Sequence, residues 1–332
     1  MKYFLLPNRF GCSVTVKSDK LVIKTEENCC KISQEKARWD RIIIPLRGGY
    51  VSLNAIEWLL QKRKSIIFLD HTGTIAGELH PLLYPQRQSL VRRLQYNMND
   101  NIRSFLFNDL IGVKLCRELM MIEWMMDHYD KDFSIQIQRI EKQKSKIINS
   151  SKKQLLAIEA NASVAYWDCI RQSLPEEWGF TARSRGLRGF TKPNRAKDSA
   201  NALLNYAYQI LIGEISRACC ATGFDAYYPF YHNEKVGMRG FCYDVLEVWR
   251  FLAEKAIIAN QDRFQESFFI TDGYGIYLLL LEGVKVVLDS VYYELYQTTS
   301  YNNRNYPWMS LITLKLEELS SFLEGKRQFS WI

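Results

Sequence analysis

NALLNYAYQILIGE, residues 201–214, and FCYDVLEVWR, residues 241–250, are the stretches that decide the fold of this chain. Both have the apolar spacing of buried helices, and Gly223 supplies a stop for the first. A polar loop that contains His232 joins them. Asp244 and Glu247 are three positions apart and therefore lie on one face of the second helix. Two carboxylates and one imidazole can thus share a pocket.

Composition is that of an ordinary globular protein. The chain has 332 residues, of which 47% are hydrophobic and 24% charged, so one large domain or two modest ones are expected. The formal net charge is +8. This positive balance favours a polyanionic partner such as nucleic acid, although a mild excess of base does not identify one alone.

The cysteines and apolar runs exclude several classes of protein. None of the eight cysteines forms a C-x-x-C pair, so a zinc knuckle is unsupported. No basic, apolar and small-residue segment opens the chain, which predicts a cytoplasmic protein with reduced thiols. Apolar runs such as residues 276–281 are far shorter than the roughly 20 residues that span a bilayer. We expect no membrane segment.

The first 80 residues have strand and turn signals. Residues 12–25 alternate around Lys17-Ser18-Asp19-Lys20 and predict a hairpin, and residues 42–44 predict a buried strand. Residues 65–70 are expected to pair with residues 74–79, and Ser52 to cap a short helix. We predict a β-rich domain over residues 1–80 and a linker over residues 81–88.

The remainder of the chain has helical patterns. They cover residues 89–148, 152–170, 201–222, 241–258, 274–296 and 311–323, and residues 299–307 form a polar break. Asp198 or Ser199 is expected to cap the third of these helices. The fold class is therefore α+β, with a small N-terminal β-rich domain followed by a larger all-α domain over residues 89–332.

Glu159 lies in an otherwise apolar stripe. The stripe has spacings of three and four and consists of Leu155, Glu159, Ala162, Tyr166 and Cys169. An unpaired carboxylate on a buried helix face is costly. Glu159 is therefore expected to be neutral, to be paired with a partner, or to line a polar cleft.

Residues 181–197 form a basic segment without acidic residues. Its cations are Arg183, Arg185, Arg188, Lys192, Arg195 and Lys197. One interpretation is a phosphate-contacting arm, whose DNA binding would weaken steeply with salt. The other is a solvated linker between helices.

Carboxylates with one imidazole select a cation such as Mg²⁺ or Mn²⁺, which suits chemistry on phosphodiesters. The residues also permit a plainer interpretation. Asp244 and Glu247 can form a solvated helix face in which Arg250 pairs with Glu247, and a lone Glu159 or His232 is more often structural.

Several motifs together resemble the Cas-one family of CRISPR-associated integrases. They are EANA at 159–162, YW at 166–167, NALLNY at 201–206, GFD at 223–225, a loop with His232 and Lys235, and YDVLEVWR at 243–250. The likeness spans nearly the whole chain. In the N-terminal part it rests mainly on layout.

The resemblance implies roles for particular residues in a catalytic helical domain. Glu159, His232 and Glu247 would be metal ligands, and Asp244 would be a further ligand or a base beside the ion. Many members have aspartate at the position of Glu247. Positions that the family uses for DNA, together with the basic segment, give a DNA-binding set of Lys235, Arg250, Arg183, Arg185, Arg188, Lys192, Arg195, Tyr206 and Tyr243. The two tyrosines are weaker candidates, because a tyrosine beside an apolar helix is more often a core residue.

The resemblance also implies a reaction and partners. The 3′-hydroxyl of a captured DNA fragment would attack a phosphodiester at the border of a CRISPR repeat, beside the leader, with Mg²⁺ or Mn²⁺ as cofactor. Family members form homodimers through the β-rich domain and assemble with the small Cas-two protein. The alternatives are a branched-DNA repair nuclease, a transposon-type integrase, and a non-catalytic DNA-binding scaffold.

Overall fold

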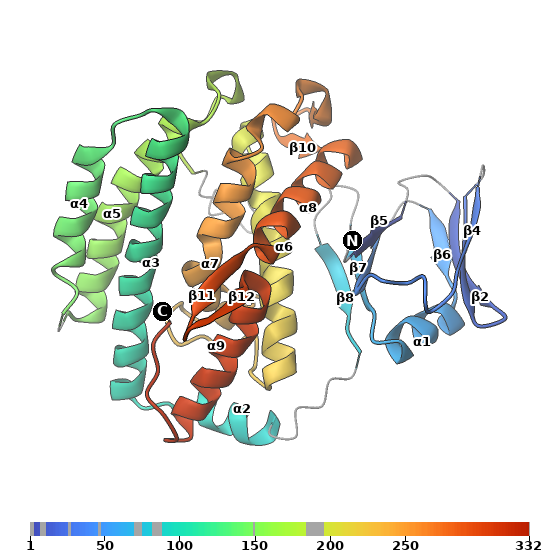
Figure 1. Cartoon of the computed structure of the whole chain (residues 1–332), viewed down its shortest axis with the longest axis horizontal. Helices are drawn as coiled ribbons and strands as arrows, with labels where there is room; N and C mark the ends of the chain where they lie inside the picture. The colour runs from blue at the N-terminus through green and yellow to red at the C-terminus, as the bar shows by residue number, and fades with distance from the viewer. Residues whose placement is uncertain are drawn as a thin grey trace. The chain divides into compact units, whose positions relative to one another are not determined.

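A computed structural model of the chain describes residues 3–6, 11–25, 28–45, 48–69, 75–81, 88–148, 150–183 and 196–331. The chain divides into two compact units, and each is described by itself (Figure 1). The first unit consists of Met1–Leu83, Glu266–Ile270 and Leu278–Lys285. The second consists of Tyr84–Gln265, Thr271–Tyr277 and Val286–Ile332.

The first unit contains two four-stranded sheets and one helix. One sheet has the order β1-β5-β7-β8, with β8 antiparallel to β7 and the other pairs parallel. The other has the order β4-β3-β2-β6, with β6 parallel to β2. The elements are β1 (Tyr3–Leu5), β2 (Cys12–Lys17), β3 (Lys20–Lys24), β4 (Cys29–Ile32), β5 (Arg41–Pro45), β6 (Gly49–Val51), α1 (Leu53–Gln61), β7 (Ser65–Leu69) and β8 (Ile75–Leu79).

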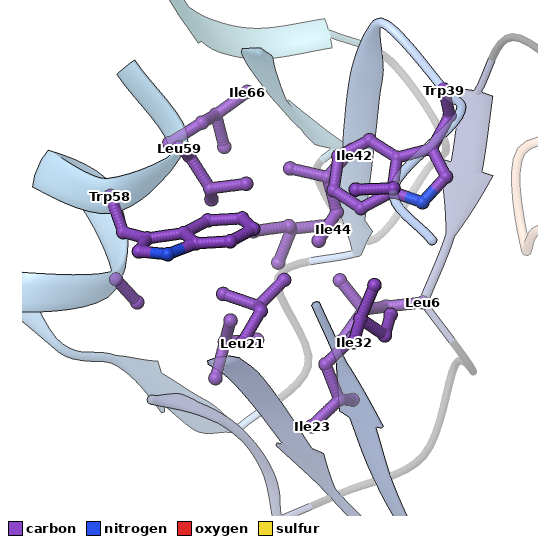
Figure 2. Close-up of a cluster of buried hydrophobic side chains, with 13 residues drawn as sticks. Leu6, Leu21, Ile23, Ile32, Trp39, Ile42, Ile44, Trp58, Leu59 and Ile66 are labelled. Atoms are coloured by element: carbon purple, nitrogen blue, oxygen red, sulfur yellow. The ribbon is translucent and has the colours of Figure 1, made fainter. Parts of the chain in front are cut away.

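Local signals explain most of this unit. Ser18 and Asp19 both have positive φ, as the tight turn of the predicted β2–β3 hairpin requires. Ser52 accepts a hydrogen bond from the backbone N–H of Ala55 and so caps α1, as predicted. Figure 2 shows Trp58 and Leu59 of α1 among apolar side chains from both sheets. Burial of these apolar faces holds the unit together.

The helical unit follows the expected order. It contains α2 (Gln88–Tyr96), α3 (Asp100–Tyr129), α4 (Ser134–Lys144), α5 (Lys152–Ser173), α6 (Ser199–Thr222), α7 (Gly240–Ile258) and α9 (Trp308–Leu323), and α8 (Leu281–Tyr296) begins in the first unit. Short 3₁₀ turns lie at Glu176–Trp178, Gln261–Arg263 and Glu266–Phe268. The predicted fold class, α+β with a strand-rich N-terminal part and a larger helical part, is confirmed.

One expectation within the later part of the chain was wrong. The pattern at residues 274–296 predicted helix throughout, but β9 (Phe269–Thr271) and β10 (Tyr277–Leu279) form a hairpin before α8. The polar break at residues 299–307 is a second hairpin, formed by β11 (Thr298–Tyr301) and β12 (Arg304–Pro307). Asn302 and Asn303 adopt positive φ at its turn, which asparagine tolerates well.

Helix α3 is the central element for the site. It packs against α5 on one side and α7 on the other, and α6 packs against α7 and α9 (Figure 1). Asp198 caps the start of α6, and Gly223 ends it with a φ of 92°. Side chains from the middle of α3 therefore point into the space between α5 and α7. No helix in the described part of the chain is long and apolar enough to span a bilayer.

Candidate active site

Two predicted metal ligands meet on one cationic atom. The Nζ atom of Lys114, in the middle of α3, contacts Oε1 of Glu159 on α5 and lies 2.7 Å from Oε2 of Glu247 on α7. The side chain of Lys114 is 3% exposed, and those of Glu159 and Glu247 are 16% and 13% exposed. The hydroxyl of Tyr231 donates to the other oxygen of Glu159. Glu159 thus finds the partner that its core-facing position required.

The charges at this point stabilise one another. Burial alone would lower the pKa of Lys114, but Glu247 and Glu159 outweigh it and raise the pKa above its ordinary value. Burial would likewise raise the pKa of Glu247, yet Lys114 and Arg250 hold it well below its ordinary range. Both groups are therefore charged at neutral pH.

Asp244 organises the histidine loop. Its carboxylate is fully buried, and it accepts hydrogen bonds from the backbone N–H groups of Phe230 at 2.6 Å, Tyr231 at 3.0 Å and His232 at 2.9 Å. It also lies 2.7 Å from Nδ1 of His232. Burial would lower the pKa of His232, but the hydrogen bond and charge of Asp244 raise it. Asp244 therefore fixes the orientation of the imidazole ring through Nδ1.

Several elements hold the segment that precedes His232. Gln95 of α2 is fully buried, and its amide donates to the carbonyls of Asp225 and Tyr228 at 2.9 Å each. Arg103 of α3 donates to the carbonyl of Pro229 at 3.3 Å. Lys152 of α5 donates to the carbonyl of Tyr231 at 2.8 Å. This loop is therefore fixed by long-range hydrogen bonds rather than by its own sequence.

Arg250 is held in a stacked and hydrogen-bonded position. Its guanidinium donates to Glu247 at 3.1 Å and to Glu254 at 2.9 Å. It lies over the rings of Trp167 and Tyr208, 5.5 and 5.3 Å from their centroids. The ion pair between Arg250 and Glu247 that the plainer interpretation expected is present, but the helix face is not solvated, because Asp244 and Glu254 are fully buried.

The asparagines of the NALLNY motif anchor Arg183. Its Nη1 donates to Asn201 at 2.7 Å and its Nη2 to Asn205 at 2.8 Å. The guanidinium lies over the same Trp167 and Tyr208 rings as Arg250 does. The described end of the basic segment is therefore tied to the network around Glu247.

The other predicted DNA-binding residues are placed differently. Lys235 is exposed in the loop after His232, and Tyr243 is half-buried with its ring edge-on to His232 at 6.4 Å. Tyr206 is 8% exposed on the packed side of α6. The remaining residues, Arg185, Arg188, Lys192 and Arg195, lie outside the described residues.

The donor atoms are of the types that suit a hard divalent cation. Among the described residues, no three histidine, cysteine, aspartate and glutamate side chains are close enough, as placed, to hold an ion. The oxygens of Glu159 and Glu247 nevertheless converge on one cationic centre, the ammonium of Lys114, and His232 adds an imidazole nitrogen. Carboxylate oxygens with one imidazole suit Mg²⁺ or Mn²⁺. Ligation by Glu159, His232 and Glu247 stays a prediction.

Sequence reasoning missed Lys114 and Tyr231. A signal for the lysine was present, because Lys114 and Glu118 lie between the apolar Leu110 and Ile122 in a row spaced by four along one helix face. A charged residue on such a stripe needs a buried partner. Tyr231 had no comparable signal, because its role depends on contact with Glu159, 72 positions away.

The strand-rich unit and the helical unit together have a fold that is found in several solved structures. A casposase bound to integration product matches with a TM-score of 0.84 at 23% identity, over 100% of this chain and 93% of that one. A Cas1 protein from Thermotoga maritima matches with a TM-score of 0.76 at 18% identity, over 99% of both chains.

The family model described as CRISPR associated protein Cas1 matches residues 5–291. The chain therefore belongs to the Cas1 family. A CRISPR-associated endonuclease Cas1 from Archaeoglobus fulgidus is 25% identical over 343 aligned positions, covering 98% of this chain and 97% of the relative. Another from Methanospirillum hungatei is 30% identical and covers 72% of this chain and 71% of the relative. The resemblance seen in the motifs is confirmed.

The support that Asp244 gives the loop can be tested by hydrogen exchange. In Asp244→Ala, the amides of residues 230–232 lose their buried acceptor, so we expect them to exchange at least about tenfold faster, since an unmade buried hydrogen bond costs roughly 1–3 kcal/mol. Mass-spectrometric exchange over this segment measures the change. Glu234→Ala, at an exposed position in the same loop, is the control. Unchanged protection in Asp244→Ala would contradict the assigned role.

Glu118 gives the unit a pH dependence. Its side chain is buried on α3 near Lys114, Glu247, Arg250, Glu254 and Tyr166. Burial raises its pKa from 4.5 to about 8, although Lys114 and Arg250 oppose the shift. A carboxyl whose pKa is raised in the fold stabilises the protein fully below the unfolded value and loses that contribution as pH rises through the folded value.

We therefore expect the melting temperature to fall between pH 4.5 and about 8 more steeply in the wild type than in Glu118→Gln, whose side chain does not titrate. Thermal unfolding in a pH series measures this difference. Glu123→Gln, at an exposed position on the same helix, should follow the wild type. Parallel profiles for the wild type and Glu118→Gln would show that Glu118 is ionised in the fold.

Proposed function

We propose that the protein is a divalent-metal-dependent DNA endonuclease and integrase that inserts short DNA fragments into a CRISPR repeat array. One observation carries this proposal: oxygens of Glu159 and Glu247 from separate helices converge on one cationic position beside an oriented His232. Membership of the Cas1 family and the endonuclease names of its relatives support the same chemistry.

Glu159, His232 and Glu247 would hold the ion, which when bound polarises the scissile phosphate and offsets charge that develops during in-line displacement. Asp244 keeps Nδ1 of His232 occupied, which would leave Nε2 as the ring nitrogen available to hold the ion. Tyr231 fixes the unused oxygen of Glu159. These contacts restrain two of the three proposed ligands, which would lower the cost of reaching the reactive arrangement.

The proposed reaction exchanges one phosphodiester bond for another. The 3′-hydroxyl of the incoming fragment attacks phosphorus at the repeat border, a new P–O bond forms, and the target strand departs with its own 3′-oxygen. Exposed Lys235 and stacked Arg250 would hold the phosphates on either side. Because one phosphodiester replaces another, the same site should reverse the reaction on branched DNA. Water in place of the hydroxyl would give endonuclease cleavage.

The proposed partners are DNA, a second copy of the chain and the small Cas-two protein. A solved chain in a Cas6-RT-Cas1–Cas2 complex matches with a TM-score of 0.74, covering 98% of this chain and 35% of that longer one. The solved casposase is bound to integration product, which supports DNA as the proposed partner. A transposon-type integrase is the second candidate, and repeat arrays or terminal inverted repeats beside the coding sequence would distinguish them.

Removal of the predicted ligands should separate catalysis from binding. With a supercoiled plasmid that carries a repeat, and with Mn²⁺ or Mg²⁺, we expect Glu159→Ala and His232→Ala to lower strand transfer by at least about a thousandfold, as loss of an essential catalytic group does. Gel analysis of nicked and joined products measures the reaction. Addition of EDTA to the wild type should have the same effect.

The matched control is Glu123→Ala, which removes an exposed glutamate from α3 and should keep wild-type activity. DNA binding, measured by fluorescence anisotropy in EDTA, should persist in all variants, because basic residues supply most of it. Strand transfer that survives both ligand substitutions would overturn the enzymatic proposal and favour a DNA-binding scaffold.

The dimer is tested separately. Multi-angle light scattering at micromolar concentration should give twice the chain mass of 39.0 kDa. We expect the dimer through the strand-rich unit, because its sheets end in strands that can pair or pack with a second copy. A strict monomer over this concentration range would contradict the homodimer, without bearing on the chemistry of the site.

A further inference from the structure

The ammonium of Lys114 lies between the carboxylates of two proposed metal ligands. Within the described residues, its ammonium makes its hydrogen bond and ion pairs to Glu159 and Glu247, from helices on either side of α3. Its side chain is nearly completely buried. A lysine in this position is therefore an internal counter-ion for carboxylates that would otherwise be buried without charge compensation.

Arg250, the other cation at the site, is held differently. It has hydrogen bonds to Glu254 and Tyr208 besides Glu247, and it lies against the ring of Trp167. Its position is therefore fixed by groups that are not proposed ligands. Lys114 has no such additional anchor in the described part of the chain, and its flexible four-carbon stem can swing without breaking other contacts.

A divalent cation and the ammonium compete for the same oxygens. Oε1 of Glu159 and Oε2 of Glu247 both contact Nζ, so an ion on these atoms would lie within a few ångströms of a positive charge. Like charges at this separation repel strongly in a partly buried site. The ammonium and the ion therefore cannot occupy the same contacts together.

We propose that Lys114 is a displaceable internal cation, which holds Glu159 and Glu247 together in the metal-free protein and must leave them when the divalent ion binds. This inference rests on the proposed metal-dependent function. Metal binding then becomes an exchange of cations. The displaced ammonium carries its charge to the edge of the site, where a DNA phosphate is the complementary group.

Local charge explains what such an exchange achieves. In the metal-free protein Glu159 and Glu247 pair with Lys114, and Glu247 and Glu254 pair with Arg250. Addition of a divalent ion leaves an excess of positive charge that DNA phosphates can neutralise. Lys114 thus weakens binding of the divalent ion in the absence of DNA. Tight binding of the ion is then coupled to the presence of the DNA substrate.

The test is a titration of the DNA-free full chain with Mn²⁺ by isothermal calorimetry. Lys114→Met keeps the apolar stem and removes the competing charge, so it should bind Mn²⁺ at least about tenfold more tightly than the wild type. Lys114→Arg keeps the charge and should not bind more tightly. Lys255→Met removes a lysine that lies elsewhere on α7 and pairs with Glu294 of α8. This variant should leave the Mn²⁺ affinity unchanged.

A second readout follows from the same variants. Without its counter-ion the metal-free Lys114→Met protein should melt at a lower temperature than the wild type, and Mn²⁺ should raise its melting temperature by more than it raises that of the wild type. Lys114→Gln is the alternative neutral variant if the methionine variant lacks the far-UV signal of a folded helical protein.

The outcomes distinguish the two proposals. Glu159→Ala, which removes a proposed ligand, sets the baseline for Mn²⁺ binding outside the site. Wild-type binding above this baseline, with weaker or equal binding in Lys114→Met, overturns the exchange role and leaves the proposed function intact. Wild-type and Lys114→Met titrations that both match the baseline show that these residues bind no ion, and both proposals then fail.

Discussion

Burial of acidic groups between helices is the constraint on which the helical unit depends. Glu159 and Glu247 project from different helices toward the same interior point, where desolvation opposes their ionised forms. Lys114, on the helix between them, compensates that cost with one charge. Helix α3, which supplies the basic residue, therefore packs between α5 and α7, which each supply one acidic residue.

Other buried acidic groups near Lys114 are also compensated by hydrogen-bond donors. Glu254 is fully buried one turn beyond Arg250, and it accepts hydrogen bonds from Tyr166 and from Tyr208 at 2.5 Å. Asp244, one turn before Glu247, is saturated by loop amides. Helix α7 thus carries a row of acids that are all paired with donors, and Arg250 serves both Glu247 and Glu254. A row of this kind keeps a polar site rigid inside an otherwise apolar bundle.

Features of the fold that depend on interactions between residues close in sequence could be predicted, and features that depend on distant residues could not. The β2–β3 hairpin and the caps at Ser52 and Asp198 were foreseen, because each is decided within a few residues of itself. The helix predicted over residues 274–296 was wrong at its start. Tyr277–Leu279 is strand there, because pairing with Phe269–Thr271 outweighs its local preference. Such pairing is invisible to a short window of sequence.

The sequence by itself determined the strand-rich and helical parts, the face that Asp244 shares with Glu247, and the family, since these follow from periodicity and motif. Only the tertiary structure decided what these acids contact. Lys114 is 45 positions from Glu159 in the chain, and the two meet because α3 packs against α5. Contacts of that kind depend on how whole helices pack, so the sequence around one residue does not identify the distant residue that it contacts.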